Sequence, residues 1–157
     1  MISQKTFFPL FVDMNGKNVL IVGGGNVAER RVRILVSFGA EIAVVSPEVT
    51  EYIERAASSN MIRLLKRKYQ KGDIAAVNPF LVIAATDDRQ VNHDVMTEAE
   101  NQNIYVSVAD CRDECTFYFP AIAENDGYIA GLVSKDGGNH DGVKRTAERI
   151  RGVLTDE

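Results

Sequence analysis

The stretch NVLIVGGGNVAERRVRIL, residues 18–35, decides the fold. Four apolar residues at positions 19–22 run directly into three glycines, and a basic, helix-like segment follows. An uninterrupted apolar run of this kind is typical of a strand that is covered on both faces in a parallel sheet. Gly23, Gly25 and Ala28 match the pattern G-x-G-x-x-G/A, at the place where a strand gives way to a helix. The stretch predicts a turn that binds the phosphates of a dinucleotide or, as the alternative, a tight strand-to-helix turn without a ligand.

Each position of this turn has an expected task. Gly23 permits the tight turn, Gly25 lets a pyrophosphate approach the backbone, and Ala28 keeps the helix close to the strand. Asn26 is the expected helix N-cap, and the free amide groups at the helix start attract a phosphate. We therefore expect Gly23, Gly25, Asn26 and Val27 to form the phosphate half of a cofactor site.

The chain up to residue 108 continues to alternate between strand and helix. Apolar, β-branched runs predict strands, and longer helical patterns lie between them. The expected strands cover residues 19–22, 42–45, 62–65, 80–85 and 104–108, and the expected helices cover residues 27–38, 49–58 and 89–102. This alternation predicts an α/β fold, a Rossmann-type doubly wound parallel sheet with the strand order 3-2-1-4-5.

The end of the second expected strand indicates which dinucleotide binds. Ser46 stands where an acidic residue usually holds the ribose, and Pro47 and Glu48 follow it. Ser46 or Glu48 could hydrogen-bond the ribose, or the position could tolerate the extra phosphate of NADP. No arginine follows at once, and the Glu48 carboxylate would repel a phosphate. We therefore expect the cofactor to be NAD.

Polar residues also follow the fourth and fifth expected strands. Thr86 and Asp87 lie beside the expected cofactor cleft, although a helix N-cap at Asp87 or Asp88 would account for these acids without a function. Asp110 follows the fifth strand. Because open α/β sheets build their sites at the carboxyl ends of the strands, this carboxylate could reach both ligand and cofactor as a general base. Otherwise Asp110 is a solvated loop acid or an N-cap.

The pattern changes after residue 108. Two apolar bursts, residues 116–119 and 128–133, predict a small β excursion without a crossover helix. The closing helix is amphipathic, with one apolar face formed by Val143, Ala147, Ile150 and Leu154. This tail is too small to fold alone, so it either packs on the preceding α/β unit or completes itself on a second subunit. We expect residues 1–113 to form the nucleotide-binding domain and residues 114–157 to form the dimerisation segment of a homodimer.

Composition and charge exclude several other classes of protein. The 157 residues carry a net charge of −4, so no basic field indicates a nucleic-acid partner. No apolar run approaches the roughly 20 residues that cross a bilayer, and the N-terminus lacks the pattern of a secretory signal, so we expect a cytoplasmic protein without a membrane partner. The two cysteines, Cys111 and Cys115, are too few for a disulfide framework, and their spacing without a second pair predicts no metal site.

Five segments together carry a family resemblance: GGGNVAERR, VVSPE, VIAATDDRQVN, VSVADCRDECTFYFPA and VSKDGG, in this order. With them the chain resembles the precorrin-2 dehydrogenase/sirohydrochlorin ferrochelatase family, the type of domain found at the N-terminus of siroheme synthases. The resemblance covers about residues 5–152. The chain departs from the family at Ser107, where Asn is usual, and at His140 and Asp141, where Ser-Pro is expected. It also ends at Glu157, without the helical region that many members carry.

The resemblance implies an NAD-dependent oxidation of the tetrapyrrole precorrin-2 to sirohydrochlorin, by a homodimer. Some members also take ferrous iron as a substrate and insert it. The family's catalytic aspartate falls on Asp110. One alternative is a regulatory NAD-binding module of the potassium-channel type, which shares the glycine turn and a segment like residues 86–92 but usually has an acid where this chain has Ser46. Another is a tetrapyrrole-binding subunit that has lost catalysis.

Overall fold

The computed structural model describes residues 6–135 and 138–155. Contacts within the chain divide it into two compact units, one formed by residues 12–116 and the other by residues 6–11 together with residues 117–155. This division differs from the expected domains 1–113 and 114–157, because the segment 6–11 belongs with the C-terminal part of the chain.

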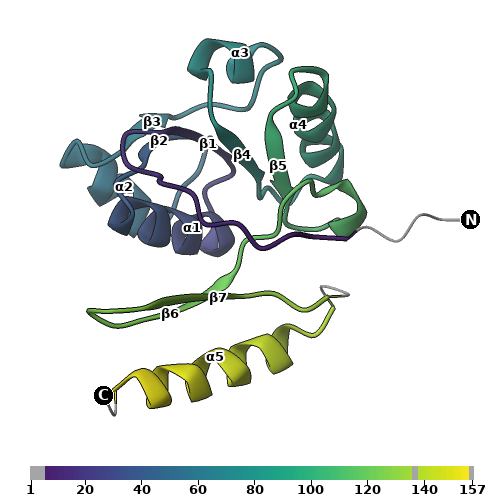
Figure 1. Ribbon diagram of the computed structural model, residues 1–157. Helices are drawn as coiled ribbons and strands as arrows, with labels where there is room; N and C mark the ends of the chain where they lie inside the picture. Colours follow the sequence, from purple (N-terminus) through teal and green to yellow (C-terminus); the bar gives the residue numbers. More distant parts are fainter. Residues whose placement is uncertain (1–5, 136–137, 156–157) are drawn as a thin grey trace, which may run out of the picture. The chain divides into compact units, whose positions relative to one another are not determined.

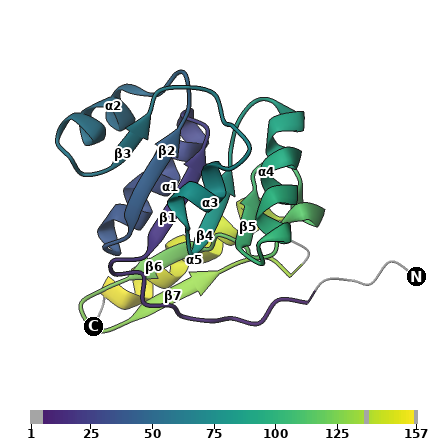
Figure 2. The same ribbon diagram turned by 90° about the horizontal axis from the view of Figure 1, so that it is seen from above.

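The larger unit is built on a five-stranded parallel sheet. Its strands are β1 (Asn18–Val22), β2 (Glu41–Val45), β3 (Arg63–Leu65), β4 (Leu81–Ala84) and β5 (Tyr105–Val108). They lie in the order β3-β2-β1-β4-β5, which confirms the predicted topology. Figure 2 shows the strands side by side in this order. The apolar runs of β1, β2 and β4 are buried on both faces, as uninterrupted apolarity predicts, whereas β3 and β5 at the two edges of the sheet are partly exposed.

Helices connect the strands on both faces of this sheet (Figure 1). The predicted crossover helices are α1 (Asn26–Ser37), α2 (Glu51–Ser58) and α4 (Arg89–Asn101). A further short helix, α3 (Asp73–Val77), was not predicted. With five residues it is too short for a 3.6-residue apolar period to show in the sequence. Among the described residues no helix is long and apolar enough to cross a membrane.

The smaller unit is a hairpin covered by a helix. Its elements are β6 (Ala121–Glu124), the antiparallel β7 (Ile129–Leu132) and α5 (His140–Thr155). The helix packs on the hairpin: the Arg151 guanidinium donates to the Ile122 carbonyl at 2.7 Å, and the side-chain amide of Asn125 donates to the Leu154 carbonyl at 2.8 Å. Phe7 joins this unit by stacking on Tyr118, with 3.8 Å between ring centroids.

The expected strand at residues 116–119 is wrong, since the first strand of the hairpin begins at Ala121. Thr116 still belongs to the larger unit, where its amide donates to the Val106 carbonyl at 2.8 Å and its hydroxyl accepts from the Val106 amide at 2.8 Å. Pro120 has no amide hydrogen for a ladder. The apolar burst is therefore an irregular connection with bends at positions 116 and 117, and strand pairing starts after it.

Candidate functional site

The loops that follow β1, β4 and β5 lie at the carboxyl edge of the sheet, as the parallel topology requires. The direction in which the chain adds strands reverses between β1 and β4, which is where open α/β sheets bind ligands. Gly23 sits at this reversal with φ +116°, and a Cβ there would stand 2.2 Å from the Ala85 carbonyl oxygen. Its amide donates to the Val45 carbonyl at 3.0 Å. Gly23 therefore joins the ends of three strands in a space that admits only glycine.

The next two glycines have opposite surroundings. A Cβ at Gly24 would stand 2.2 Å from the Glu48 carbonyl oxygen, and the Thr50 amide donates to the Gly24 carbonyl at 3.0 Å. Gly24 thus fixes the β1 turn against the loop after β2, a role that the sequence pattern did not reveal. Beside Gly25 a Cβ would meet no atom within 4 Å. The backbone is bare there, as close approach of a pyrophosphate requires.

The start of α1 suits an anion. Asn26 was expected to cap this helix, but the cap is Gly25, whose backbone is extended and whose carbonyl accepts from the Glu29 amide at 2.9 Å. Asn26 is therefore the first helical residue, and no side chain caps the helix. By contrast, the caps of α2 and α4 are side chains, Thr50 and Asp88. The uncapped amides of α1, next to the open space at Gly25, fit the phosphates of a dinucleotide.

Three residues of the loop after β2 were expected at the cofactor site, and one of them, Ser46, is buried while the other two are exposed. Ser46 is only 7% exposed, and its hydroxyl donates to the Glu48 carbonyl at 2.6 Å within its own loop. Pro47 and Glu48 are exposed. Of the two candidates for the ribose, Glu48 has the accessible side chain.

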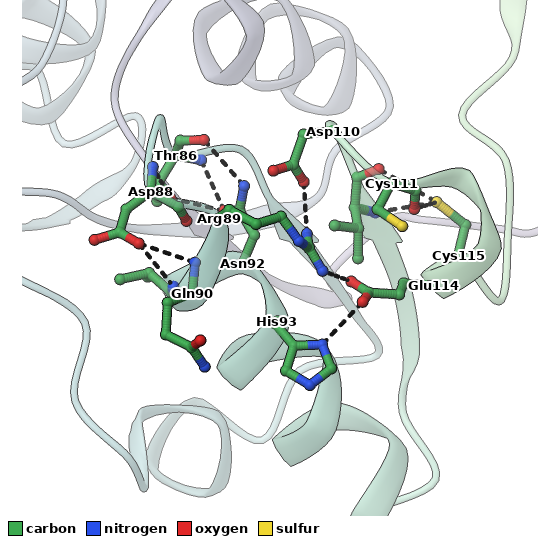
Figure 3. Close-up of polar contacts among 12 residues, drawn as sticks. Thr86, Asp88, Arg89, Gln90, Asn92, His93, Asp110, Cys111, Glu114 and Cys115 are labelled. Carbon is green, nitrogen blue, oxygen red and sulfur yellow. Dashed lines mark hydrogen bonds and ion pairs between the residues drawn. The ribbon is translucent and has the colours of Figure 1, made fainter.

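The loop after β4 is fixed by a buried amide. Asn92, on α4, is fully buried; its Oδ1 accepts from the Thr86 amide at 3.0 Å and its Nδ2 donates to the Thr86 carbonyl at 3.0 Å (Figure 3). Asp88 caps α4 by accepting from the amides of Gln90 and Val91. The N-cap alternative therefore holds for Asp88, while Asp87 stays exposed at the carboxyl edge.

Asp110 lies in the turn after β5 within a cluster of charged side chains (Figure 3). Its Oδ1 accepts from Arg89 Nη1 at 2.9 Å, and Arg89 Nη2 pairs with Glu114 Oε2. The other oxygen of Glu114 lies 2.8 Å from His93 Nδ1. Partial burial acts to raise the pKa of Glu114, but the hydrogen bonds from Arg89 and His93 outweigh it and hold that pKa below its usual value. Glu114 is therefore a carboxylate at neutral pH.

The sequence predicted Asp110 as a site residue but not its three charged neighbours, Arg89, His93 and Glu114. A usable signal exists for two of them, because Arg89 and His93 are four residues apart on an expected helix and so share a face. Glu114 belongs to a short 3-10 helix, Arg112–Glu114, which has no periodic signal.

The two cysteines are free thiols. Cys115 is buried and its sulfur accepts from the Val108 amide at 3.2 Å, so it is part of the packing that holds the loop after β5. Within residues 6–135 and 138–155, no three His, Cys, Asp or Glu side chains are grouped as metal ligands.

Comparison with known families assigns the larger unit. Residues 10–121 match the family model NAD_binding_7, described as "Putative NAD(P)-binding". The chain belongs to this NAD(P)-binding family. Its sheet order, its glycine turn and its uncapped α1 are the features through which a member of the family would hold a nicotinamide dinucleotide.

Individual relatives confirm the resemblance drawn from the sequence. The chain is 50% identical over 146 residues to the "Probable multifunctional siroheme biosynthesis protein HemA" of Ruminiclostridium josui, covering 93% of this chain and 28% of that protein. It is 36% identical to a siroheme synthase of Photorhabdus laumondii, over 82% of this chain and 27% of the relative. The chain thus spans about a quarter of the length of these two relatives.

A solved structure gives the same likeness in three dimensions. The structure of SirC, precorrin-2 dehydrogenase, is similar with a TM-score of 0.79 and 28% identity, over 93% of this chain and 70% of that one. The likeness therefore takes in most of both chains.

Proposed function

We propose that this NAD(P)-binding chain oxidises precorrin-2 to sirohydrochlorin with NAD as the acceptor. The observation that carries the proposal is the bare backbone at Gly25 and the uncapped start of α1 at the same sheet edge as the Asp110 carboxylate. We infer the substrate from the names of the siroheme relatives and of SirC, precorrin-2 dehydrogenase.

The choice of NAD over NADP follows from the charges beside β2. Glu48 is exposed there and would repel a 2′-phosphate. The first two cations after the neighbouring β3 are engaged elsewhere: Lys66 Nζ pairs with Glu54 at 2.9 Å, and Arg67 with Asp73 at 2.7 Å. In calorimetry we expect tighter binding of NAD than of NADP, and the reverse order would overturn this choice.

The chain's own residues have separable tasks in the reaction. Gly25, Asn26 and Val27 would hold the phosphates, on the tight turn that Gly23 permits. Glu48 would hold the ribose, and Thr86 and Asp87 would line the cleft between β1 and β4, while Ser46 and Pro47 shape the ribose loop. Precorrin-2 loses two hydrogens in this oxidation: one leaves with two electrons as a hydride, for which the nicotinamide would supply the acceptor when bound, and the other leaves as a proton. Asp110 would accept that proton at Oδ2, since its Oδ1 is bonded to Arg89.

The decisive test mixes the purified protein with precorrin-2 and NAD and follows sirohydrochlorin by absorbance. General-base assistance is worth about 100- to 10,000-fold, so Asp110→Asn should lower kcat within or near that range while leaving NAD affinity nearly unchanged. Glu100→Gln is the matched control, because Glu100 is an exposed carboxylate near the far end of α4. A parental protein that does not form sirohydrochlorin, or an Asp110→Asn variant that reacts at the parental rate, would contradict the respective part of the proposal.

The two other functions predict different outcomes. A regulatory module of the potassium-channel type would bind NAD without turnover of precorrin-2, and a tetrapyrrole-binding subunit would bind the macrocycle without reducing NAD. The siroheme relatives favour the dehydrogenase over the channel module.

Three further features belong to the proposal. We propose a homodimer formed through the smaller unit, a cytoplasmic location, and ferrous iron as a second substrate. Adding ferrous iron to the completed oxidation and following the siroheme spectrum tests the last of these independently of the dehydrogenase.

A further inference from the structure

The charged cluster around Asp110 links two elements of the larger unit. Arg89 and His93 extend from α4, while Asp110 and Glu114 belong to the loop after β5 (Figure 3). The Arg89 guanidinium bonds Asp110 through Nη1 and Glu114 through Nη2. We infer that Arg89 is the positioning residue of Asp110, and that Glu114 and His93 hold Arg89 in place. The inference deepens the proposed function and rests on it.

Asp110 needs such a partner because an exposed carboxylate in a turn has few contacts of its own to fix its rotamer. Its side chain is 37% exposed and lies in a turn directly after β5. An exposed carboxylate on a turn samples several rotamers, whereas a general base must be held close to one geometry. The bond from Arg89 fixes Oδ1 and leaves Oδ2 to face a substrate proton.

Glu114 holds the other terminal nitrogen of Arg89, Nη2. The Arg89 side chain is 45% exposed, but Glu114 is only 18% exposed, so the pair with Glu114 anchors the guanidinium against a less mobile carboxylate. Glu114 is itself held by His93 through its other oxygen. Hydrogen bonding to Glu114, and the charges of Asp110 and Glu114, raise the pKa of Arg89, which keeps the guanidinium charged across the working range.

Local stability does not explain an arginine at this place. Arg89 is the first residue of α4, where the helix dipole disfavours a cation, and its own helix gains nothing from it. The Arg89–Asp110 pair, with side chains 45% and 37% exposed, contributes little to folding. The remaining effect of the contact is to fix the geometry of Asp110.

The test measures kcat and KM for NAD and for precorrin-2 in Arg89→Gln, Arg89→Lys and the parental protein. A misplacement of about 1 Å costs about 100-fold, so Arg89→Gln should lower kcat about 10- to 100-fold, with KM for NAD and Tm nearly unchanged. Arg89→Lys keeps one charged donor and should recover part of the loss. Arg55→Gln is the matched control, because Arg55 is an exposed arginine paired with Glu51 on α2.

A double-variant cycle separates positioning from an independent role. If Arg89 acts through Asp110, adding Arg89→Gln to Asp110→Asn should lower kcat by less than about threefold further, because the group that it positions is already lost. Parental kcat in Arg89→Gln, or the full 10- to 100-fold loss again in the Asp110→Asn background, would overturn the inference while leaving the proposed function standing. A parental protein without precorrin-2 oxidation would overturn both.

Discussion

At the scale of single residues, three consecutive glycines perform three different tasks. Gly23 has a positive φ and faces the end of β4, Gly24 lies against the loop after β2, and Gly25 faces open space. Only the third task concerns a ligand, because the first two are met by atoms of the chain itself. Substitutions at these neighbouring positions should therefore separate folding from binding.

Gly25→Leu should leave the fold intact and remove dinucleotide binding. The added side chain meets no atom of the protein within 4 Å of its Cβ, but it fills the space expected for the pyrophosphate. We expect the Kd for NAD in calorimetry to rise at least about 100-fold, which corresponds to about 2.7 kcal/mol. Gly152→Leu is the control, since its Cβ also meets nothing within 4 Å and it lies in α5. Unchanged NAD affinity in Gly25→Leu would place the phosphates elsewhere.

The sequence predicted the glycine turn but not the helix cap at Gly25 or the partner of Asp110, for physical reasons. Gly23, Gly25 and Ala28 were found because their tasks depend on local geometry at fixed spacing. The cap at Gly25 in place of Asn26 was not found, since it depends on the backbone angles at one residue. The bond between Arg89 and Asp110 joins residues 21 positions apart on different elements, and no local pattern records it.

At the scale of elements, the junction between β4 and α4 depends on Asn92. This buried amide makes hydrogen bonds to both the amide and the carbonyl of Thr86. Removing it leaves the part-buried amide and carbonyl of Thr86 without these partners, at a cost of about 1–3 kcal/mol each. The junction carries Asp88 and Arg89 directly after it, so its stability bears on the site as well as on the fold.

Asn92→Ala should lower the free energy of unfolding by about 2–4 kcal/mol in urea denaturation, because two backbone bonds and the packing of a fully buried side chain are lost. Thr97→Ala serves as the control on the same helix, at an exposed position where about 0.5 kcal/mol or less is expected. An equally small change in Asn92→Ala would show that other contacts fix the loop.

The connection from β3 to α3 predicts a pH dependence. Hydrogen bonds from Arg67 lower the pKa of Asp73, against the opposing effect of its burial, and the Gln70 amide adds to the lowering. A carboxyl whose pKa is lower in the folded state stabilises the protein above the unfolded value, about 3.9, and loses that contribution as the pH falls through the folded value.

Asp73→Asn should therefore be destabilised by about 1–3 kcal/mol at pH 7, and its deficit against the parental protein should shrink below about pH 4. Urea unfolding at pH 7, 5, 4 and 3 measures both quantities. A deficit of the same size at pH 3 and pH 7 would mean that Asp73 acts through packing and not through its charge.

At the scale of the whole molecule, the sequence predicted the larger unit better than the smaller one. Strand order followed from five buried runs separated by helical patterns, each of which is a local signal. The smaller unit combines residues 6–11 with residues 117–155, two segments from opposite ends of the chain. Local patterns could predict its hairpin and helix, but not that the N-terminal segment joins them.

The smaller unit leaves apolar surface exposed, and we expect a second copy of the chain to cover it. A two-stranded sheet is marginally stable in water by itself, and both outer edges of the hairpin β6–β7 are unpaired among the described strands. Large apolar side chains remain exposed on the unit: Phe8, Leu10, Phe11, Tyr128, Ile129, Val133 and Val153. Val153 also lines a hollow on α5 with Thr146, Arg149, Ile150 and Gly152.

Sedimentation velocity should accordingly give a homodimer at tens of micromolar, a generous concentration for a stable interface. Val153→Asp places a charge at the hollow on the exposed side of α5, where Val153 is 66% exposed, and should shift the protein toward the monomer without loss of helical circular dichroism. Lys144→Glu is the matched control, because position 144 lies about 180° around the helix from position 153 and is already polar. A parental protein that sediments as a monomer at this concentration would contradict the homodimer. A dimer that Val153→Asp leaves as stable as Lys144→Glu does would place the interface away from the Val153 side of α5.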